Sequence, residues 1–364
     1  MDLRRLGAAA LPIIAGLAFA ATTVAVLASA GSTLGADAKA YLGAAHRLMG
    51  GRPLYDLSYM ATGPTMLFDY PPPFAFVALP FALLPAPLDV LAWTVGLIAA
   101  FAAGVALLPV HREVRWVIFL LAGLSWPFAY ALKLGQVGPI LLLCFAAGWR
   151  WLDRPGLLGG AIAAGTIVKL QPAILLGWAV LTGRRPAATV AGALLIAVAV
   201  GVSVLVGPSA WVEWATLLRQ ITAPVTAAHS FTPGAIAYQF GVPAGTASMI
   251  QIASTVGVIA VFLAAIRWST AEASYLVAIV ASQLVSPILW DHYAMLLLLP
   301  VAYLLSAGRW WAVAIPLATA WPLIGITPPV VYPVVFWVTM VATFVVGRTA
   351  RDEGMNGLGE AVAA

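Results

Sequence analysis

The sequence predicts an all-α, polytopic integral membrane protein with about 11–13 membrane passes. Its 364 residues are 63% hydrophobic and only 9% charged, whereas soluble domains hold roughly 45–50% apolar and about 25% charged residues. The mean hydropathy is +1.00, and apolar runs of membrane-spanning length recur along the chain. A water-soluble core cannot absorb this much apolar surface, so the sequence excludes a cytosolic protein.

Arginines mark the breaks between the apolar runs and indicate how the chain is oriented. They are Arg4, Arg5, Arg112, Arg115, Arg150, Arg154, Arg184, Arg185, Arg267, Arg309, Arg348 and Arg351. Because arginine-rich loops stay in the cytoplasm, we expect both termini there, with residues 6–30 as a retained first helix and Asp37 outside. The net charge of +5 then reflects topology and does not indicate nucleic-acid binding.

Prolines predict where two long apolar runs are interrupted. Pro85 and Pro87 should divide 71–109 into a short piece and a full span. The run 156–182 should either form one span against the charge rule or bend in the middle, with Lys169-Leu-Gln171-Pro172 as the natural place for the bend. Proline removes a backbone donor and disfavours helix at the residue before it. The other predicted passes are 116–131, 138–149, 186–206, 249–266, 273–288, 295–305, 310–324 and 330–346.

The chain is expected to form a single integral membrane domain over 1–364. Two polar intervals should lie outside the cytoplasm: 31–70, with its juxtamembrane helices, and 207–247. The polar segment 348–364 is expected to form a cytoplasmic tail.

Polar and ionisable residues gather at the outer helix ends of this topology. They are Asp37, Asp69, Tyr70, Lys133, Gln136, Lys169, Gln171, Glu213, Arg219, Asp291 and His292. Ionisable groups at membrane depth are costly and mark functional pathways, so we expect one external cavity with lipid access. The sequence has no phosphate-binding loop, no dinucleotide fingerprint and no Asp-x-Asp pair for a metal-bound nucleotide. A sugar donor used outside the cytoplasm must therefore arrive on a lipid.

An ordered set of short motifs resembles glycosyltransferase family 87. The set comprises Asp37, Tyr41, Gly51-x-Pro53-x-Tyr55, Tyr70-Pro71-Pro72, Leu134-Gly135-Gln136, Lys169-x-Gln171-Pro172 and Ser286-Pro287-x-x-Trp290-Asp291-His292. The resemblance covers 37–293 and implies a GT-C-type fold in the plasma membrane, among membrane lipids. It further implies a mannosyltransferase that uses a polyprenyl-phosphate sugar donor and a lipid-linked or glycan acceptor, and no cofactor is expected.

The resemblance implies that Asp37 is the catalytic base. An acceptor hydroxyl loses its proton as it attacks the anomeric carbon, and inversion needs one carboxylate whereas a double displacement needs a second as nucleophile. Cations or hydrogen-bond donors should neutralise the lipid phosphate that leaves. The candidates for this are His292, Lys169, Lys133 and Arg219, in that order. Candidates for substrate binding are Tyr70, Gln136, Gln171, Trp290, Asp291 and Tyr293.

Other interpretations stay open at this point. Asp37 could cap a juxtamembrane helix, His292 could be an interfacial side chain, and Lys169 could reach the interface through its long stem. The whole protein could instead be a transporter or flippase for lipid-linked sugars, which would show inverted repeats and mid-membrane charges. It could also be a non-catalytic glycolipid-binding membrane subunit. No metal site is expected, because Asp291 and His292 offer at most two adjacent ligands.

Overall fold

The computed structural model describes residues 3–55 and 67–363, which form helices and contain no strand. Five helices within these ranges are long and apolar enough to cross a membrane, or six if the bent pair α6–α7 is counted as one span. The polytopic helical class predicted from the sequence is therefore confirmed, while the number of passes stays a prediction. Residues 56–66, which belong to the first predicted external interval, lie outside the described residues.

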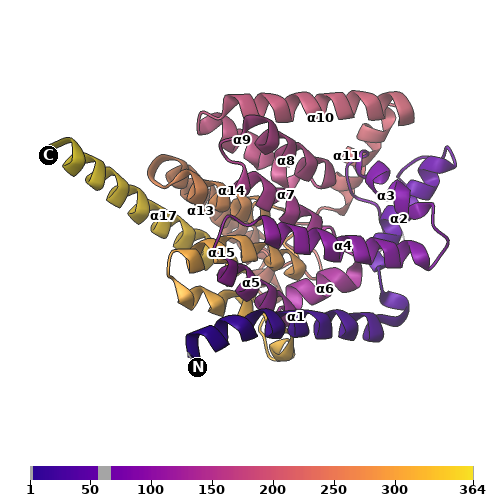
Figure 1. The fold of residues 1–364 in the computed structure, drawn as a ribbon. Coiled ribbons are helices and arrows are strands. Elements are labelled where there is room, and N and C mark those ends of the chain that lie inside the picture. Colours follow the sequence, from indigo (N-terminus) through magenta and orange to yellow (C-terminus); the bar gives the residue numbers. More distant parts are fainter. Residues whose placement is uncertain (1–2, 56–66, 364) are drawn as a thin grey trace.

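The long apolar helices form the flanks of the bundle and pass through it. They are α1 (Leu3–Ala30), α4 (Leu88–Leu107), α10 (Arg185–Val206), α13 (Ala244–Trp268) and α17 (Val331–Ala363). Figure 1 shows α1 and α10 on opposite flanks, and only 11% of the apolar window of each is buried inside the protein. Their outward apolar surface suits contact with lipid, where a helix satisfies its own backbone groups.

Shorter helices fill the centre of the bundle. They are α7 (Gly138–Arg150), α8 (Pro155–Val168), α9 (Ile174–Leu181), α14 (Ala271–Leu284) and α15 (Leu298–Ser306). Every residue of α14 from Ala273 to Leu284 is buried, because α7, α9, α13, α15 and α17 all pack against it. A helix that is apolar all round belongs in such an interior. Because α14 ends inside the bundle, the polar segment that follows it, 285–293, also begins there.

The predicted pass 116–131 is wrong, because the structure divides it into α5 (Arg112–Leu124) and α6 (Trp126–Leu134). Ser125 has extended backbone, and its hydroxyl caps the start of α6. Pro127 occupies the first turn of α6, where its missing N–H is not needed. A serine cap followed by proline starts a new helix, and this is the signal in the sequence that marks the break.

Both proline breaks predicted in the first half of the chain are confirmed. The short helix α3 (Phe74–Ala82) ends before α4, and α8 ends before Lys169. The chain then forms the short 3-10 helix η3 (Gln171–Ala173) and continues as α9.

Prolines also interrupt the predicted pass 310–324, which is not one helix. The structure has three short pieces there: η5 (Trp310–Val313), α16 (Ala314–Leu317) and η6 (Trp321–Leu323). Pro316 and Pro322 lack the backbone donor that a continuous helix needs. In contrast, α17 continues through the segment predicted as a polar tail, so 348–363 is helical.

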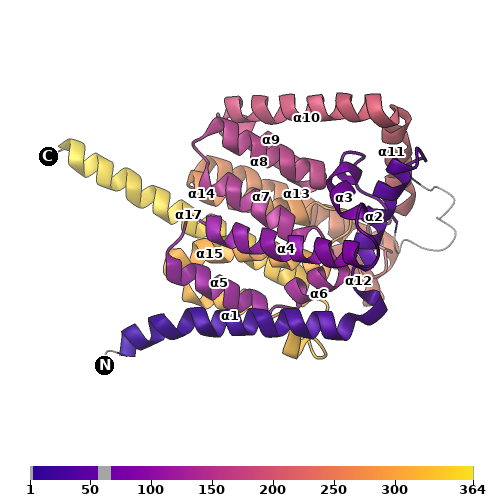
Figure 2. The same ribbon diagram turned by 45° about the vertical axis from the view of Figure 1, so that its right-hand side comes forward.

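The two ends of the bundle carry different elements. The N and C termini lie at one end, and α2 (Ala36–Met49), α3 and α11 (Ser209–Ile221) lie at the other (Figure 1, Figure 2). The remaining short elements are η1 (Gly31–Thr33), α12 (Pro233–Gln239) and η4 (Asp291–Leu297). Arginines of the α9–α10 turn, α13 and α17 gather at the end that holds the termini.

Candidate active site

Most of the polar residues singled out in the sequence meet at the end of the bundle opposite to the termini. Four segments contribute: the first turn of α2, the α6–α7 turn, the α8–η3 break, and residues 285–293, which link α14 to η4 and include the first turn of η4. A helix starts or ends in each segment, so the side chains there extend past the helix ends and lie close to one another.

A glycine turn brings the first two segments together. Gly135 has φ of +75°, and a Cβ at this position would lie 2.6 Å from the Cβ of Ala38. Trp93 Nε1 donates to the Gly135 carbonyl at 2.8 Å, and the Gly35 N–H donates to the Lys133 carbonyl at 2.8 Å. The start of α2 therefore packs directly on the α6–α7 turn, at a distance that only glycine permits.

The amide of Gln136 links the carboxylate of Asp37 to two tyrosines. Its Nε2 donates to Asp37 Oδ2, and its Oε1 accepts from the Tyr70 hydroxyl at 3.0 Å. The Tyr41 hydroxyl donates to that of Tyr70 at 2.9 Å. Oδ1 of Asp37 accepts no hydrogen bond from the described residues, so one carboxylate oxygen is fixed and the other remains for a ligand.

The environment of Asp37 makes it a stronger base than an ordinary aspartate. Burial raises the pKa of this carboxyl, and the effect exceeds the opposing influence of the Gln136 hydrogen bond and of the His292 and Lys169 charges. A desolvated carboxylate with a raised pKa is suited to accept a proton from a hydroxyl.

Lys169 places an ammonium group beside this network. Its Nζ donates to the Tyr293 hydroxyl, and it lies 4.3 Å from the centre of the Tyr293 ring and 5.3 Å from that of Tyr70. Such positions over aromatic faces favour a cation. Two residues further on, Gln171 Nε2 donates to Ser286 Oγ at 2.9 Å, which fixes the α8–η3 break against the end of α14.

His292 is buried, and neither ring nitrogen forms a hydrogen bond with the described residues, although Nδ1 lies 3.5 Å from Asp291 Oδ1. Its neighbour Asp291 accepts from Trp126 Nε1 at 2.9 Å and from the His292 backbone N–H at 2.8 Å. The His292 ring packs against Trp290, with centroids 6.2 Å apart, and edge-on against Tyr293 at 4.9 Å. Buried polar atoms without partners are rare and costly, so Nε2, which has no acidic group beside it either, points to a bound ligand.

Two of the predicted cations lie apart from these contacts. Lys133 is partly exposed, and its side chain makes no ion pair or hydrogen bond within the part of the chain that the structure describes. Arg219 is exposed on α11, with no ion pair or hydrogen bond of its side chain to the described residues. The structure therefore joins Lys169 and His292 to Asp37 electrostatically, but it does not join Lys133 or Arg219 to them by contact.

Three residues of the site were assigned no catalytic or binding role from the sequence. Tyr41 lies one helical turn after Asp37 on α2, a spacing that puts the two side chains on one face and could have found it. Asp69 interacts electrostatically with Asp37 and Lys169, and burial raises the pKa of its carboxyl. Trp126, which holds Asp291, carries no signal in the sequence. Among the described residues, no three His, Cys, Asp or Glu side chains are grouped to hold a metal ion.

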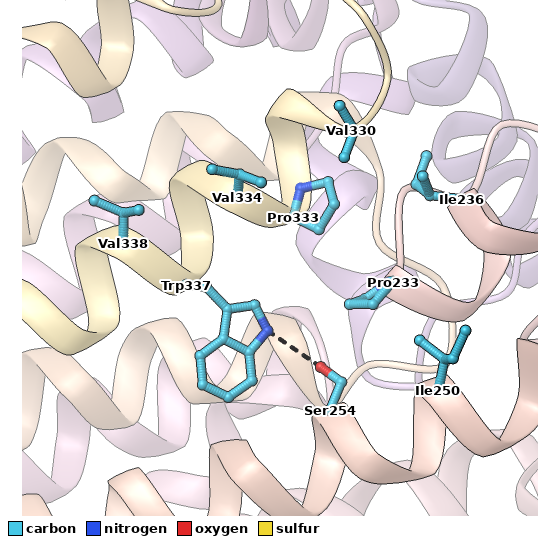
Figure 3. Close-up of a pocket in the computed structure, with 9 residues that line it drawn as sticks. All are labelled: Pro233, Ile236, Ile250, Ser254, Val330, Pro333, Val334, Trp337 and Val338. Carbon is cyan, nitrogen blue, oxygen red and sulfur yellow. Dashed lines mark hydrogen bonds between the residues drawn. The ribbon is translucent and has the colours of Figure 1, made fainter.

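A separate groove lies between α12, α13 and α17, and it is apolar. It has a volume of about 500 Å³ and is lined by Pro233, Ile236, Ile250, Ser254, Val330, Pro333, Val334, Trp337 and Val338 (Figure 3). Its polar atoms satisfy one another, because Trp337 Nε1 donates to Ser254 Oγ at 3.2 Å. With no titratable side chain in its walls, the groove suits hydrocarbon and offers no catalytic group.

Comparisons with known proteins agree on one family. A family model described as glycosyltransferase family 87 matches residues 68–287. A polyprenol-phosphate-mannose-dependent alpha-(1-2)-phosphatidylinositol pentamannoside mannosyltransferase from Mycolicibacterium smegmatis is 32% identical over 278 residues. That match spans 71% of this chain and 66% of the relative, which is just under two thirds of its length. No solved structure matches the chain.

Proposed function

The chain belongs to glycosyltransferase family 87, and we propose that it transfers mannose from a polyprenyl-phosphate donor to an acceptor hydroxyl. The donor class follows that in the name of the mycobacterial relative, and the acceptor is a lipid-linked or other glycan. One observation carries the proposal: the Asp37 carboxylate shares a cluster with the Lys169 ammonium and the His292 ring. A base and groups that stabilise a phosphate are what this transfer requires.

The proposed reaction is a single displacement at the anomeric carbon. The acceptor oxygen bonds to that carbon while Asp37 takes its proton, and the bond between the carbon and the phosphate oxygen breaks. The electron pair leaves with the polyprenyl phosphate, whose growing negative charge Lys169 and His292 stabilise. One carboxylate is sufficient for this inverting path.

The polar neighbours of Asp37 have a positioning role in this proposal. Gln136 holds Oδ2 so that Oδ1 faces the acceptor, and Tyr41 and Tyr70 hold the Gln136 amide in turn. Trp290 and Tyr293 provide aromatic faces for the sugar or the first prenyl units, while Gln171 and Asp291 order the segment that carries His292. Lys133 and Arg219 stay proposed donor-binding residues at the rim.

We place the site on the extracytoplasmic side of the plasma membrane. The arginines that gather with the termini mark the cytoplasmic end under the positive-inside rule. Both termini and the segment 348–364 then lie in the cytoplasm. The intervals 31–70 and 207–247 lie outside, within reach of a lipid-linked acceptor.

The test is donor turnover by the purified protein in nanodiscs. Synthetic polyprenyl phosphate carrying radiolabelled mannose would be mixed with a panel of glycolipid acceptors, including phosphatidylinositol mannosides. We expect the wild type to release polyprenyl phosphate and label an acceptor, and Asp37→Asn to be slower by about 10²–10⁴-fold with an unchanged unfolding temperature. Full activity of Asp37→Asn would remove the proposed base. A folded wild type that never consumes the donor would favour transport or glycolipid binding.

A further inference from the structure

A polar cavity lies at the end of the bundle that holds the termini, away from the candidate active site. Its volume is about 390 Å³, and three arginines from separate parts of the chain line it: Arg184, Arg267 and Arg351. Arg184 follows α9, Arg267 lies in the last turn of α13, and Arg351 lies in α17. The positive-inside rule explains arginines at this end, but it does not require three of them to face one hollow.

Two of these arginines are held by backbone carbonyls. Arg351 Nη1 donates to the Arg267 carbonyl at 2.6 Å and to the Ser269 carbonyl at 3.5 Å. Arg184 Nε donates to the Leu152 carbonyl at 3.3 Å, and its guanidinium lies 5.1 Å from the Trp178 ring centre. A guanidinium has five N–H donors, so both retain donors after these bonds.

The charge of the cavity is only partly balanced by acidic groups. Arg184 Nη2 lies 3.6 Å from Asp153 Oδ1, but the side chain of Asp153 is 94% exposed and therefore well screened by water. Glu272, at the start of α14, is a second acidic group close enough to Asp153 for the two carboxylates to repel each other. The guanidinium of Arg267 forms no ion pair or hydrogen bond with the described residues. Thr182 and Ser269 also line the cavity, while their hydroxyls donate to the carbonyls of Trp178 and Ala265.

We propose that this cavity binds the phosphate of an anionic phospholipid headgroup. Arginine matches phosphate geometry with paired N–H donors, and three of them around one hollow can surround a phosphodiester. A lipid is favoured over free phosphate because the rim is apolar: Leu181 and Ile266 line the cavity, and Leu181 is 56% exposed. The exposed Trp268 beside them is typical of a membrane interface.

The proposed lipid site is distinct from the donor site and does not depend on the proposed function. Ser269 precedes α14, whereas Ser286 follows it, so the 14 residues of α14 separate the two sites by about 21 Å. A headgroup bound here would join the α9–α10 turn, the α13–α14 turn and α17. Since it binds only the folded protein, it stabilises that state.

The test is native mass spectrometry of the full chain with phosphatidylglycerol, phosphatidylcholine or inorganic phosphate. Arg267→Gln removes a guanidinium that forms no ion pair or hydrogen bond with the described residues. The control is Arg309→Gln, because Arg309 is an exposed arginine of the same charge that does not line the cavity. We expect the wild type and Arg309→Gln to bind phosphatidylglycerol in preference to phosphatidylcholine, and Arg267→Gln to lose about fivefold in affinity for phosphatidylglycerol. Equal affinities for all three proteins would overturn the proposal.

A second variant and a competition measurement complete the test. Arg184→Gln should give a similar loss, so the proposal can still fail if Arg267→Gln does not fold. Inorganic phosphate should not displace phosphatidylglycerol from the wild type at equal concentration. Full displacement by phosphate would replace the lipid with a free anion and overturn the lipid assignment.

Discussion

The carboxylate of Asp37 accepts a hydrogen bond from the amide of Gln136, although the two residues are 99 positions apart in sequence. The contact depends on backbone geometry on both sides, because Gly35 and Gly135 both have positive φ and the α2 helix packs on the α6–α7 turn. The same amide also reaches Tyr70. The proposed base is therefore held by a network that extends to the beginning of α3, and its basicity depends on that network.

The acid limb of the pH profile of kcat/KM should lie at a higher pH than an ordinary aspartate would give. Asp37 can act as a base only when ionised, so kcat/KM should fall as the pH drops through the pKa of this carboxyl. Because burial raises that pKa, the fall should come at a higher pH than for an ordinary aspartate, whose pKa is about 3.9. Donor turnover in nanodiscs across the acidic range measures it. A limb centred at the ordinary value would contradict the desolvation argument.

Replacing Gln136 should change both the rate and the pH profile. The Gln136→Leu variant lacks the hydrogen bond that lowers the pKa of Asp37, so the acid limb should shift to still higher pH. A bond to a charged group contributes about 1.5–3 kcal/mol, so kcat should fall by roughly 10–100-fold.

The matched control for Gln136 is a buried glutamine elsewhere in the bundle. Gln251 on α13 accepts from the Gly234 N–H at 3.1 Å, so Gln251→Leu also leaves a buried donor unpaired. It should lower stability and leave the pH limb in place. Identical limbs in the two variants and the wild type would show that Gln136 has only a structural role.

Lys169 should act on the donor. Lys169→Met removes the charge next to Tyr70 and Tyr293, so kcat/KM for the polyprenyl-phosphate donor should fall by about 10²–10³-fold. Lys169→Arg keeps the charge and should recover part of the activity. Kinetics at varied donor concentration separate this from acceptor effects. Normal donor kinetics in Lys169→Met would exclude the phosphate role.

The sequence predicts the class of fold and most of the cluster, but not how its members are joined. The outliers Asp37, Lys169 and His292 stand out because ionisable residues are rare in an apolar chain. Their contacts depend on where helices break. The break at the Ser125 cap was not predicted, and it is this break that places Trp126 against Asp291. The sequence ranks Arg219 last among the candidate cations but does not show that it is exposed, since the exposure of α11 is set by tertiary packing.

Replacing His292 by phenylalanine should lower donor turnover without lowering the unfolding temperature. His292→Phe keeps an aromatic ring against Trp290 and Tyr293, but removes two buried nitrogens that form no hydrogen bond with the described residues. Removing unsatisfied polar atoms costs little or stabilises a fold, so the unfolding temperature should stay equal or rise while donor turnover falls. Thermal unfolding and donor kinetics on the same sample test both parts. A large drop in unfolding temperature would mean that the ring nitrogens serve the fold.

Alanine at Gly135 should destabilise the protein more than alanine at Gly183, which has the same backbone conformation. Gly135 and Gly183 have φ of +75° and +76°, but only at Gly135 would a Cβ meet a neighbour, the Cβ of Ala38 at 2.6 Å. Gly183→Ala should cost about 1–2 kcal/mol through the left-handed backbone alone. Gly135→Ala should cost about 1–3 kcal/mol more, because α2 must move away.

The movement of α2 would also break the contact between Asp37 and Gln136, so Gly135→Ala should lose donor turnover while Gly183→Ala keeps it. Unfolding temperatures and turnover of both variants, measured in the same nanodiscs, provide the comparison. Equal unfolding shifts together with equal activity would mean that α2 does not depend on the close approach at Gly135. In that case another element must hold the Asp37 carboxylate in place.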